Sequence, residues 1–183
     1  SCFWAARLLS SISNLQSVTS IGEFAFHDTG LTSFVWPSGA ATVPEHCFRY
    51  CSLLSISNLQ HVTSFGAGAF YRTTALTSFV WPSGADTVPV WCFAYASSLA
   101  SITNLGAVQA VEGWAFWNTP QLPHVYLPPG TSVGTDAFYG NTGGHTVGEH
   151  SFYGTHAQPP SQPPPSSPPS PSPAPPPPSP SPP

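Results

Sequence analysis

A pattern of 22 to 23 residues repeats along most of the chain, and it constrains the fold more than any other feature. A unit this short cannot bury its own apolar side chains, so neighbouring units must stack and share one core. The repeats therefore predict a solenoid of about six coils. One phenylalanine marks each unit, and we expect these rings to form a ladder in the core and not a ligand site: Phe26, Phe48, Phe70, Phe93, Phe116 and Phe138.

Alternate units resemble each other more closely than neighbouring units do. The phrase LTSFVWPSG at residues 31–39 returns at 76–84, and a weaker copy lies at 122–130. The other units carry Ile-Ser-Asn-Leu or Ile-Thr-Asn-Leu. We expect their asparagines to point inward and to hydrogen-bond the turns of adjacent coils, because an unpaired buried amide costs about 1–3 kcal/mol. Trp36 and Trp81 fill the matching level of the core. These asparagines are Asn14, Asn58 and Asn104.

Each unit opens with a short run in which apolar residues alternate with serine or threonine, as a half-buried strand does. No unit contains the ten or more periodic residues that a helix needs, so the rest of the unit is predicted as coil with short helical turns. After Phe138 the period fails, because Phe152 arrives 14 residues later. The strand part is expected to be lost there. We predict a repeat array over residues 1–157, with 139–157 as an irregular C-terminal cap.

The composition changes abruptly at residue 158. Residues 159–183 hold 16 of the 24 prolines, mixed almost wholly with serine. Proline fixes φ and removes a backbone donor, so neither helix nor sheet is favoured. Residues 158–183 are predicted to be a disordered tail or linker in the polyproline II conformation, rising about 3.1 Å per residue. A proline-recognition domain is a possible partner for this tail, and O-glycosylation is a second expectation from its composition.

The repeat resembles that of the BspA-like leucine-rich repeat family of surface proteins. The best matches are VTSIGEFAF at residues 18–26 and VTSFGAGAF at 62–70. The resemblance implies a right-handed leucine-rich repeat solenoid with short parallel strands on its concave face. It also implies adhesion or binding, and it brings no catalytic residues. Asn58 and its equivalents stand where that family usually has an aliphatic residue. The Ser-Pro tail is similar to the extensin-like, hydroxyproline-rich wall glycoproteins of plants and green algae.

Charge excludes several classes of partner. Only 5% of the residues are charged, and the cations are Arg7, Arg49 and Arg72. Three arginines can neutralise few phosphates, so nucleic-acid binding is disfavoured, as is a basic membrane-surface patch. No stretch reaches the roughly 18 consecutive apolar residues that a membrane span requires. The chain also opens inside a repeat, and we therefore expect it to be a fragment.

The cysteines indicate structure and not chemistry. Cys2, Cys47 and Cys92 share one position on alternate coils, about 10 Å apart, which is beyond the reach of a disulfide. Cys47 and Cys51 could approach each other across a corner, and the sequence leaves their pairing open. We expect buried thiols that act as small apolar residues.

No metal, cofactor or catalytic group is predicted. His145, His150 and His156, with Glu149 nearby, are suitable ligand types, but their intervals match no standard metal pattern. We interpret them as polar residues of the cap. No serine has the context of a nucleophile, so the chain is predicted not to be an enzyme.

The outward strand positions are the candidate binding surface, because the concave face of a solenoid commonly binds partners. This strand face is small, uncharged and rich in hydroxyl groups. The alternative is that serine and valine merely suit short exposed strands. The strand face consists of Ser11, Ser13, Ser33, Val35, Ser55, Ser57, Ser78, Val80, Ser101, Thr103, His124 and Tyr126.

Three functions follow from these observations. The first is a non-enzymatic protein- or glycan-binding adhesion module, at the cell surface or in the extracellular matrix, with its ligand on the strand face. The second is an intracellular scaffold whose proline-rich tail docks SH3, WW or profilin-type domains. The third is a fragment of a larger receptor or enzyme.

Overall fold

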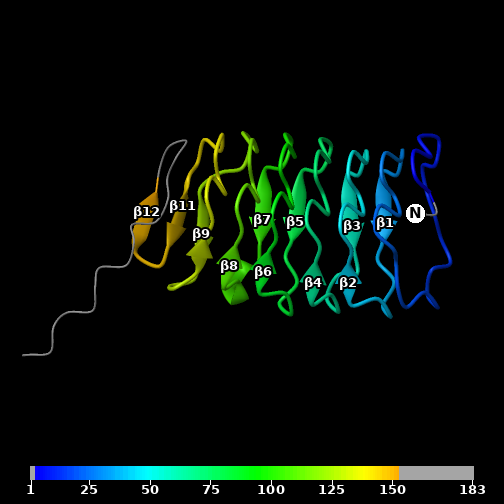
Figure 1. Ribbon diagram of the computed structural model, residues 1–183, viewed down its shortest axis with the longest axis horizontal. Coiled ribbons are helices and arrows are strands. Elements are labelled where there is room, and N and C mark those ends of the chain that lie inside the picture. Colours follow the sequence, from blue (N-terminus) through cyan, green and yellow to red (C-terminus); the bar gives the residue numbers. More distant parts are fainter. Residues whose placement is uncertain (1–2, 153–183) are drawn as a thin grey trace, which may run out of the picture.

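The chain forms a solenoid whose coils stack along one axis (Figure 1). The computed structural model describes residues 3–152. Cys2, His156 and the proline-rich residues 158–183 lie outside the described residues, so the predictions made for them remain predictions. Within residues 3–152 no helix is both long enough and apolar enough to cross a membrane.

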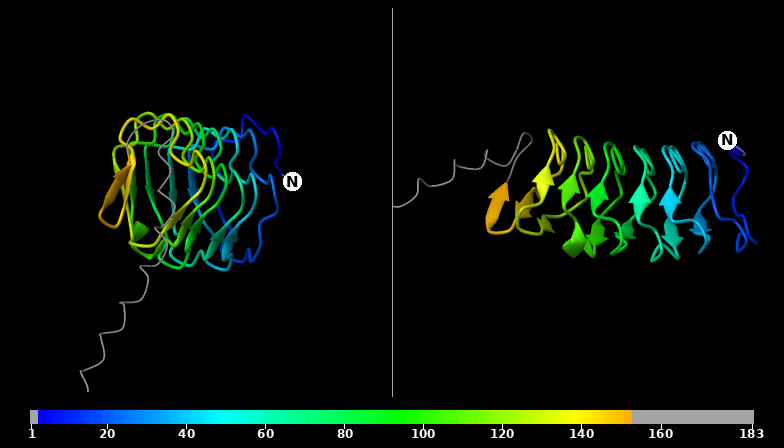
Figure 2. Two further views of the ribbon diagram at one scale, coloured as in Figure 1. Left: turned by 60° about the vertical axis from the view of Figure 1, so that its left-hand side comes forward. Right: turned by 60° about the horizontal axis from the view of Figure 1, so that its bottom comes forward.

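Two rows of short strands run along the solenoid (Figures 1 and 2). The first row holds β1 (Ser33–Val35), β3 (Ser55–Ser57), β5 (Ser78–Val80), β7 (Ser101–Thr103), β9 (Val125–Leu127) and β11 (His145–Val147). The second row holds β2 (Thr42–Val43), β4 (Ser64–Phe65), β6 (Thr87–Val88), β8 (Ala110–Val111) and β10 (Ser132–Val133). The 3-10 helix η1 (Leu105–Ala107) and the strand β12 (His150–Phe152) complete the described elements.

From residue 33 onward the first row confirms the predicted parallel strands, and its register follows the repeat. The run at residues 9–14 was also expected to be a strand, and it contains none. Phe34 faces Ile56 between β1 and β3, and Phe79 faces Ile102 between β5 and β7. The row is divided into separate sheets, β1–β3, β5–β7 and β9–β11–β12. Each parallel pair therefore joins one Phe-Val-Trp coil, or the third copy at β9, to the coil that follows it.

The second row occupies residues for which coil or short helical turns were predicted. Its strands are two residues long, too short for their alternation to be visible in the sequence. One residue of each strand points inward, and Val43, Phe65, Val88 and Val111 are all buried. These side chains close the core on the side opposite the first-row phenylalanines.

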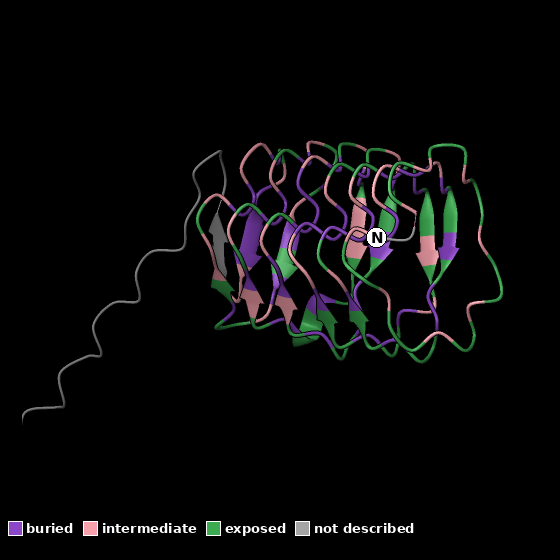
Figure 3. Cartoon of the chain, turned by 45° about the vertical axis from the view of Figure 1, so that its right-hand side comes forward, coloured by how far each residue is buried: buried purple, intermediate pink, exposed green. Residues whose placement is uncertain are grey.

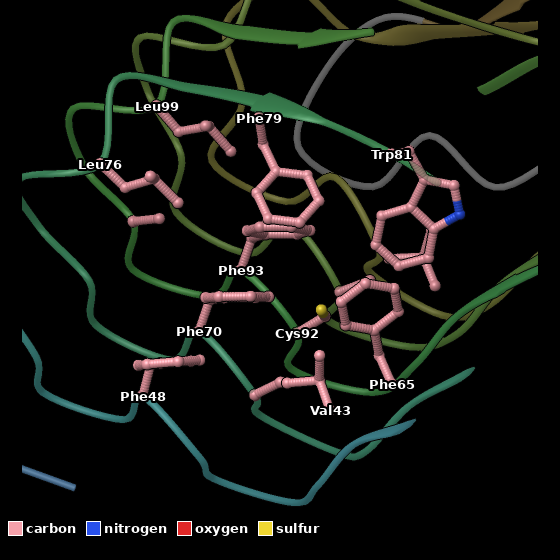
Figure 4. Packing of buried hydrophobic residues seen from close by; sticks show 14 of the residues in the cluster. Val43, Phe48, Phe65, Phe70, Leu76, Phe79, Trp81, Cys92, Phe93 and Leu99 are labelled. Atoms are coloured by element: carbon pink, nitrogen blue, oxygen red, sulfur yellow. The ribbon is translucent and has the colours of Figure 1, made fainter. Parts of the chain in front are cut away.

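The phenylalanine ladder is confirmed. From Phe26 to Phe138 the successive rings have centroids 5.0 to 5.6 Å apart and planes within 17° of parallel. Figure 4 shows the rings of Phe48, Phe70 and Phe93 stacked, with Phe79 above them. Every ring of the ladder is buried, so it stabilises the core and offers no ligand surface.

Each ladder phenylalanine lies at a tight corner of the backbone. The residues two before and two after it have positive φ, as at His46 (52°) and Tyr50 (59°) around Phe48. This alternation aims backbone N–H groups along the solenoid axis. The N–H of Phe48 donates to the carbonyl of Ala69 at 2.8 Å. The equivalent bond is formed by Phe26, Phe70, Phe93 and Phe116.

The predicted role of the asparagines is confirmed in part. Asn58 and Asn104 donate from Nδ2 to the carbonyls of Trp36 and Trp81, both at 2.6 Å, and both tryptophans are fully buried. The prediction that these side chains point inward was wrong, because Asn58 is half-buried and both Asn104 and Asn14 are exposed. All three have φ between 62° and 66°, which turns the chain out of the strand.

The expected loss of a strand after Phe138 was wrong. The strand β11 pairs parallel with β9, and His145 faces Val125. The strand β12 then closes an antiparallel hairpin on β11. The first inward residue of β11 is His145, so the apolar alternation that marks the other coils is missing from the sequence there.

The described cysteines are free, buried thiols, as expected. Burial raises the pKa of Cys47, Cys51 and Cys92. Cys51 takes the place that a threonine has in the preceding coil, and its sulfur lies 3.1 Å from the hydroxyl of Thr29. Its role is therefore a weak hydrogen bond between coils.

Candidate binding surfaces

The strand face consists of exposed residues of the first strand row and of the run at residues 9–14 that precedes it. Figure 3 shows exposed and buried segments alternating along the coils. All of its predicted residues are exposed except Ser101 and His124, which are half-buried. Val35, Val80 and Tyr126 are 64%, 66% and 73% exposed, so large apolar groups meet solvent there. The structure therefore brings the predicted residues together on one surface.

Three grooves cross the strand face where the first row is not paired. The first lies between residues 12–16 and 35–38, and it encloses about 240 Å³. The second lies between 56–60 and 80–83, with about 330 Å³, and the third between 101–105 and 122–126, with about 170 Å³. The first two grooves are lined by the same positions of alternate coils, so they lie about 10 Å apart. The third groove shares its first segment with them, but its second segment lies earlier in the coil.

The grooves carry no Asp, Glu, Lys or Arg, and their lining combines a larger apolar part with uncharged polar groups. Serine hydroxyls and asparagine and glutamine amides lie between apolar edges. Gln60 donates to the Oδ1 of Asn58 at 2.8 Å, while the Nδ2 of Asn58 holds Trp36. These contacts fix the amides in place, and such a lining suits an uncharged ligand with hydroxyl or amide groups.

His124 is engaged within the fold and is less available than predicted. Its Nδ1 contacts the carbonyl of Gly143, and its Nε2 contacts the hydroxyl of Thr146. Since a carbonyl only accepts, Nδ1 carries the proton and Nε2 accepts from Thr146. The ring thereby joins the β9 coil to the β11 coil, and the exposed ring of Tyr126 lies against it at 5.0 Å.

A second surface was missed by the sequence analysis. At the corners, aromatic side chains beside the core ladder form a row along the solenoid. Tyr50, Tyr71, Tyr95 and Trp117 follow one another with centroids 5.2 to 5.8 Å apart. We call this surface the aromatic edge, and it consists of Phe24, His27, His46, Arg49, Tyr50, Tyr71, Arg72, Trp91, Tyr95, Trp114 and Trp117.

Two arginines are part of this edge. The guanidinium carbon of Arg49 lies 4.9 Å from the ring centre of Tyr71, and that of Arg72 lies 4.7 Å from Tyr95. Such cation–π contacts hold the guanidinium groups against the rings. The sequence analysis treated the arginines only as charges. Their positions one and two residues after the ladder phenylalanines Phe48 and Phe70 could have indicated that they lie at the corners.

The aromatic edge has a notch of about 220 Å³, lined by His46, Arg49, Tyr71, Trp91 and Trp117. Gly68 lies between His46 and Trp91 in the series of corner positions, and the His46 ring lies against it, where a β-carbon would collide. Nδ1 of His46 and Nε of Arg49 are buried and have no hydrogen-bond partner within residues 3–152. Burial and the charge of Arg49 lower the pKa of His46.

The prediction that His145 is a polar residue of the cap was wrong. His145 is fully buried and stacks on Phe138 at 4.4 Å, so it belongs to the core. Burial is the main cause that lowers its pKa to about 4, and His124, when protonated, acts in the same direction. Within residues 3–152, no three His, Cys, Asp or Glu side chains lie close enough together to hold a metal ion.

The fold is similar to those of several bacterial surface and repeat proteins. A leucine-rich cell surface protein from Faecalibacterium prausnitzii is 28% identical with a TM-score of 0.66, over 75% of this chain and 38% of that one. A leucine-rich repeat protein from Bacteroides ovatus is 20% identical with a TM-score of 0.58, over 76% and 42%. The pneumococcal vaccine antigen PcpA is 16% identical with a TM-score of 0.50, over 68% and 41%.

This chain spans about two fifths of the length of these structures. The two that are below 25% identity show the fold alone. A search of curated proteins finds no significant match. The model of the BspA-type leucine-rich repeat region, by contrast, matches six copies over residues 19–144. That match covers more than half of the sequence and coincides with the stacked coils, and the chain therefore belongs to the BspA-type leucine-rich repeat family.

Proposed function

We propose that this chain is a non-enzymatic adhesion module that binds a protein or glycan on its strand face, at the cell surface or in the extracellular matrix. One observation carries the proposal: an uncharged groove repeats at equal positions in two alternate coils, and a third uncharged groove lies further along the same face. The likeness to a solved cell surface protein supports the location.

Repeated grooves favour a long ligand that fills several of them at once. Each groove offers hydroxyl and amide groups for hydrogen bonds, and Val35, Val80 or Tyr126 adds an apolar edge. Linking several weak contacts raises the overall affinity, because later contacts form within one complex. The parallel strand pairs keep the grooves at fixed spacing, so little ordering is needed on binding.

A glycan array and a library of extracellular proteins, both probed with the full chain, test this function. The substitutions Val35→Arg and Val80→Arg place long cations at two groove edges and should abolish binding. The substitution Ser132→Arg, on the exposed second strand row, is the matched control. If the paired arginine variant binds the same ligand as strongly as the control, the strand face is not the binding surface.

A further inference from the structure

We propose that the aromatic edge is a second binding site, separate from the strand face, and that it docks the proline-rich residues 159–183 of this same chain. The edge has the features of a polyproline II receptor, and the chain carries such a sequence. The strand face and the aromatic edge share no residue, so this inference does not rest on the proposed adhesion function.

The spacing of the edge fits the period of the segment. Proline-rich segments dock in grooves lined by aromatic rings, and a polyproline II helix repeats about every 9 Å, which is three residues. Alternate coils of the solenoid lie about 10 Å apart. The rings of Trp91 and Trp114 stack with centroids 5.8 Å apart, and the two residues are 39% and 36% exposed, so they form a ridge that begins at the notch. If one proline ring fills the notch, the proline three residues further along the segment lies beside the corner two coils away.

Hydrogen-bonding groups are complementary. Proline has no backbone N–H, so a proline-rich segment offers carbonyl acceptors and few donors. The edge offers donors: Nε of Arg49 is unpartnered among the described residues. Within residues 3–152 no hydrogen bond occupies the indole N–H groups of Trp91, Trp114 and Trp117 either, whereas those of the buried Trp36 and Trp81 bond to carbonyls.

Charge also favours this occupant. Residues 159–183 contain no charged side chain. The two arginines of the edge are accompanied by acids, since Glu45 lies 3.3 Å from His46 and Glu112 accepts a hydrogen bond from the backbone of Val90, beside Trp91. A strongly anionic ligand would meet these carboxylates, and a strongly cationic one would meet Arg49 and Arg72. A neutral segment meets neither penalty.

The tryptophan rings are not needed to build the corners. Trp91 and Trp114 have φ of 55° and 56°, which is a conformation that glycine adopts far more readily than an aromatic residue. The equivalent positions of other corners hold Gly68, with φ of 58°, and Asp136. A backbone cost is therefore accepted at Trp91 and Trp114 for residues that remain more than one third exposed. Binding gives these exposed rings a role.

The segment is long enough to reach its own solenoid. Twenty-five residues at about 3.1 Å each span roughly 75 Å, against roughly 35 Å for a stack of seven coils. The described chain ends at Phe152, on the terminal strand of the same stack. Because the segment is tethered, its effective concentration at the edge is high even if the intrinsic contact is weak.

Indole N–H signals in an NMR spectrum of the full chain, labelled with ¹⁵N-tryptophan, test the proposal. The comparison is a full chain in which every proline of residues 159–183 is replaced by serine. We expect the signals of Trp91, Trp114 and Trp117 to differ between the two chains. The signals of Trp36 and Trp81 should coincide, because their indoles are buried and hydrogen-bonded, and they report that both chains are folded.

Adding a synthetic peptide of residues 159–183 to the serine-substituted chain should shift the three edge signals towards their positions in the parent chain. The shift should saturate as the peptide concentration rises. Trp91→Gly should weaken this peptide binding about tenfold without unfolding, since glycine suits the corner. Val35→Arg on the strand face should leave it unchanged. Identical edge signals in the two chains, with no saturable shift on adding peptide, would overturn the proposal. Neutral oligosaccharides that move these signals when the peptide does not would show that the edge is a glycan site.

Discussion

The side-chain amide of Asn58 donates to the carbonyl of Trp36 in the preceding coil at 2.6 Å, and Asn104 repeats this bond to Trp81. The alternate character of the repeats thus has a physical cause. One coil places a tryptophan in the core, and the next coil caps the carbonyl that follows its strand. Asn58 also has φ of 64°, which asparagine tolerates better than most residues.

Replacing this asparagine separates the two roles. Asn58→Ala removes the hydrogen bond and places alanine at positive φ, and we expect it to lower the free energy of unfolding by about 2–3 kcal/mol. Asn58→Gly removes only the bond, because glycine accepts this φ, and should cost about 1 kcal/mol. Urea denaturation of both variants measures the difference. Equal stability of the two variants would contradict the backbone role.

The ladder predicts a large cost for removing one ring. Phe70 is fully buried between Phe48 and Phe93, with ring centroids at 5.6 and 5.3 Å. Phe70→Ala should lower the free energy of unfolding by about 3–5 kcal/mol, because the stacked neighbours cannot close the cavity. Val35→Ala, at an exposed strand position, should change it by about 0.5 kcal/mol or less. A melting temperature of Phe70→Ala within a degree of that of the parent would contradict the stabilising role of the ladder.

The buried thiols give a chemical measure of opening. Cys92 is fully buried and its pKa is raised by desolvation, so little thiolate forms in the folded chain. We expect Cys92 to resist a thiol-specific alkylating reagent in the native state and to react once denaturant unfolds the coils. Cys51, with a smaller rise in pKa, should also be protected. Mass mapping of the alkylated cysteines provides the measurement, and rapid native labelling of Cys92 would show that the core opens readily.

The features set by the 22-residue period could be predicted, because every stacked coil must present the same inward residues. The Phe ladder and the Leu and Ile core positions follow from that rule. The same holds for the outward positions of the strand face, from Ser33 to Tyr126. They needed only alternation along each strand, and their exposure follows from the pleat.

The remaining features depend on contacts between coils that the sequence does not display. The second groove, for example, arises because β3 does not pair with β5, and no residue in either strand indicates this in the sequence. The aromatic edge depends on corner backbone angles that bring Tyr71 beside Tyr50 and Tyr95. The strand β11 was hidden because His145 replaces an apolar residue at the inward position.

His145 makes the stability of the last coils depend on pH. Its pKa in the folded chain is about 4, because the buried ring cannot easily accept a proton, and an unfolded histidine has a pKa of about 6.5. Between these values the unfolded chain binds more protons than the folded chain. The free energy of unfolding should therefore fall as the pH is lowered through this window, by on the order of 2 kcal/mol between pH 7 and pH 5.

Burial and nearby charges also lower the pKa of His27 and His46, which adds to the same trend. The substitution His145→Phe separates the contributions, because phenylalanine keeps a ring stacked on Phe138 and cannot be protonated. Urea denaturation at several pH values should show a shallower slope for His145→Phe than for the parent. An unchanged slope would mean that His145 is protonated as easily in the folded chain as in the unfolded one.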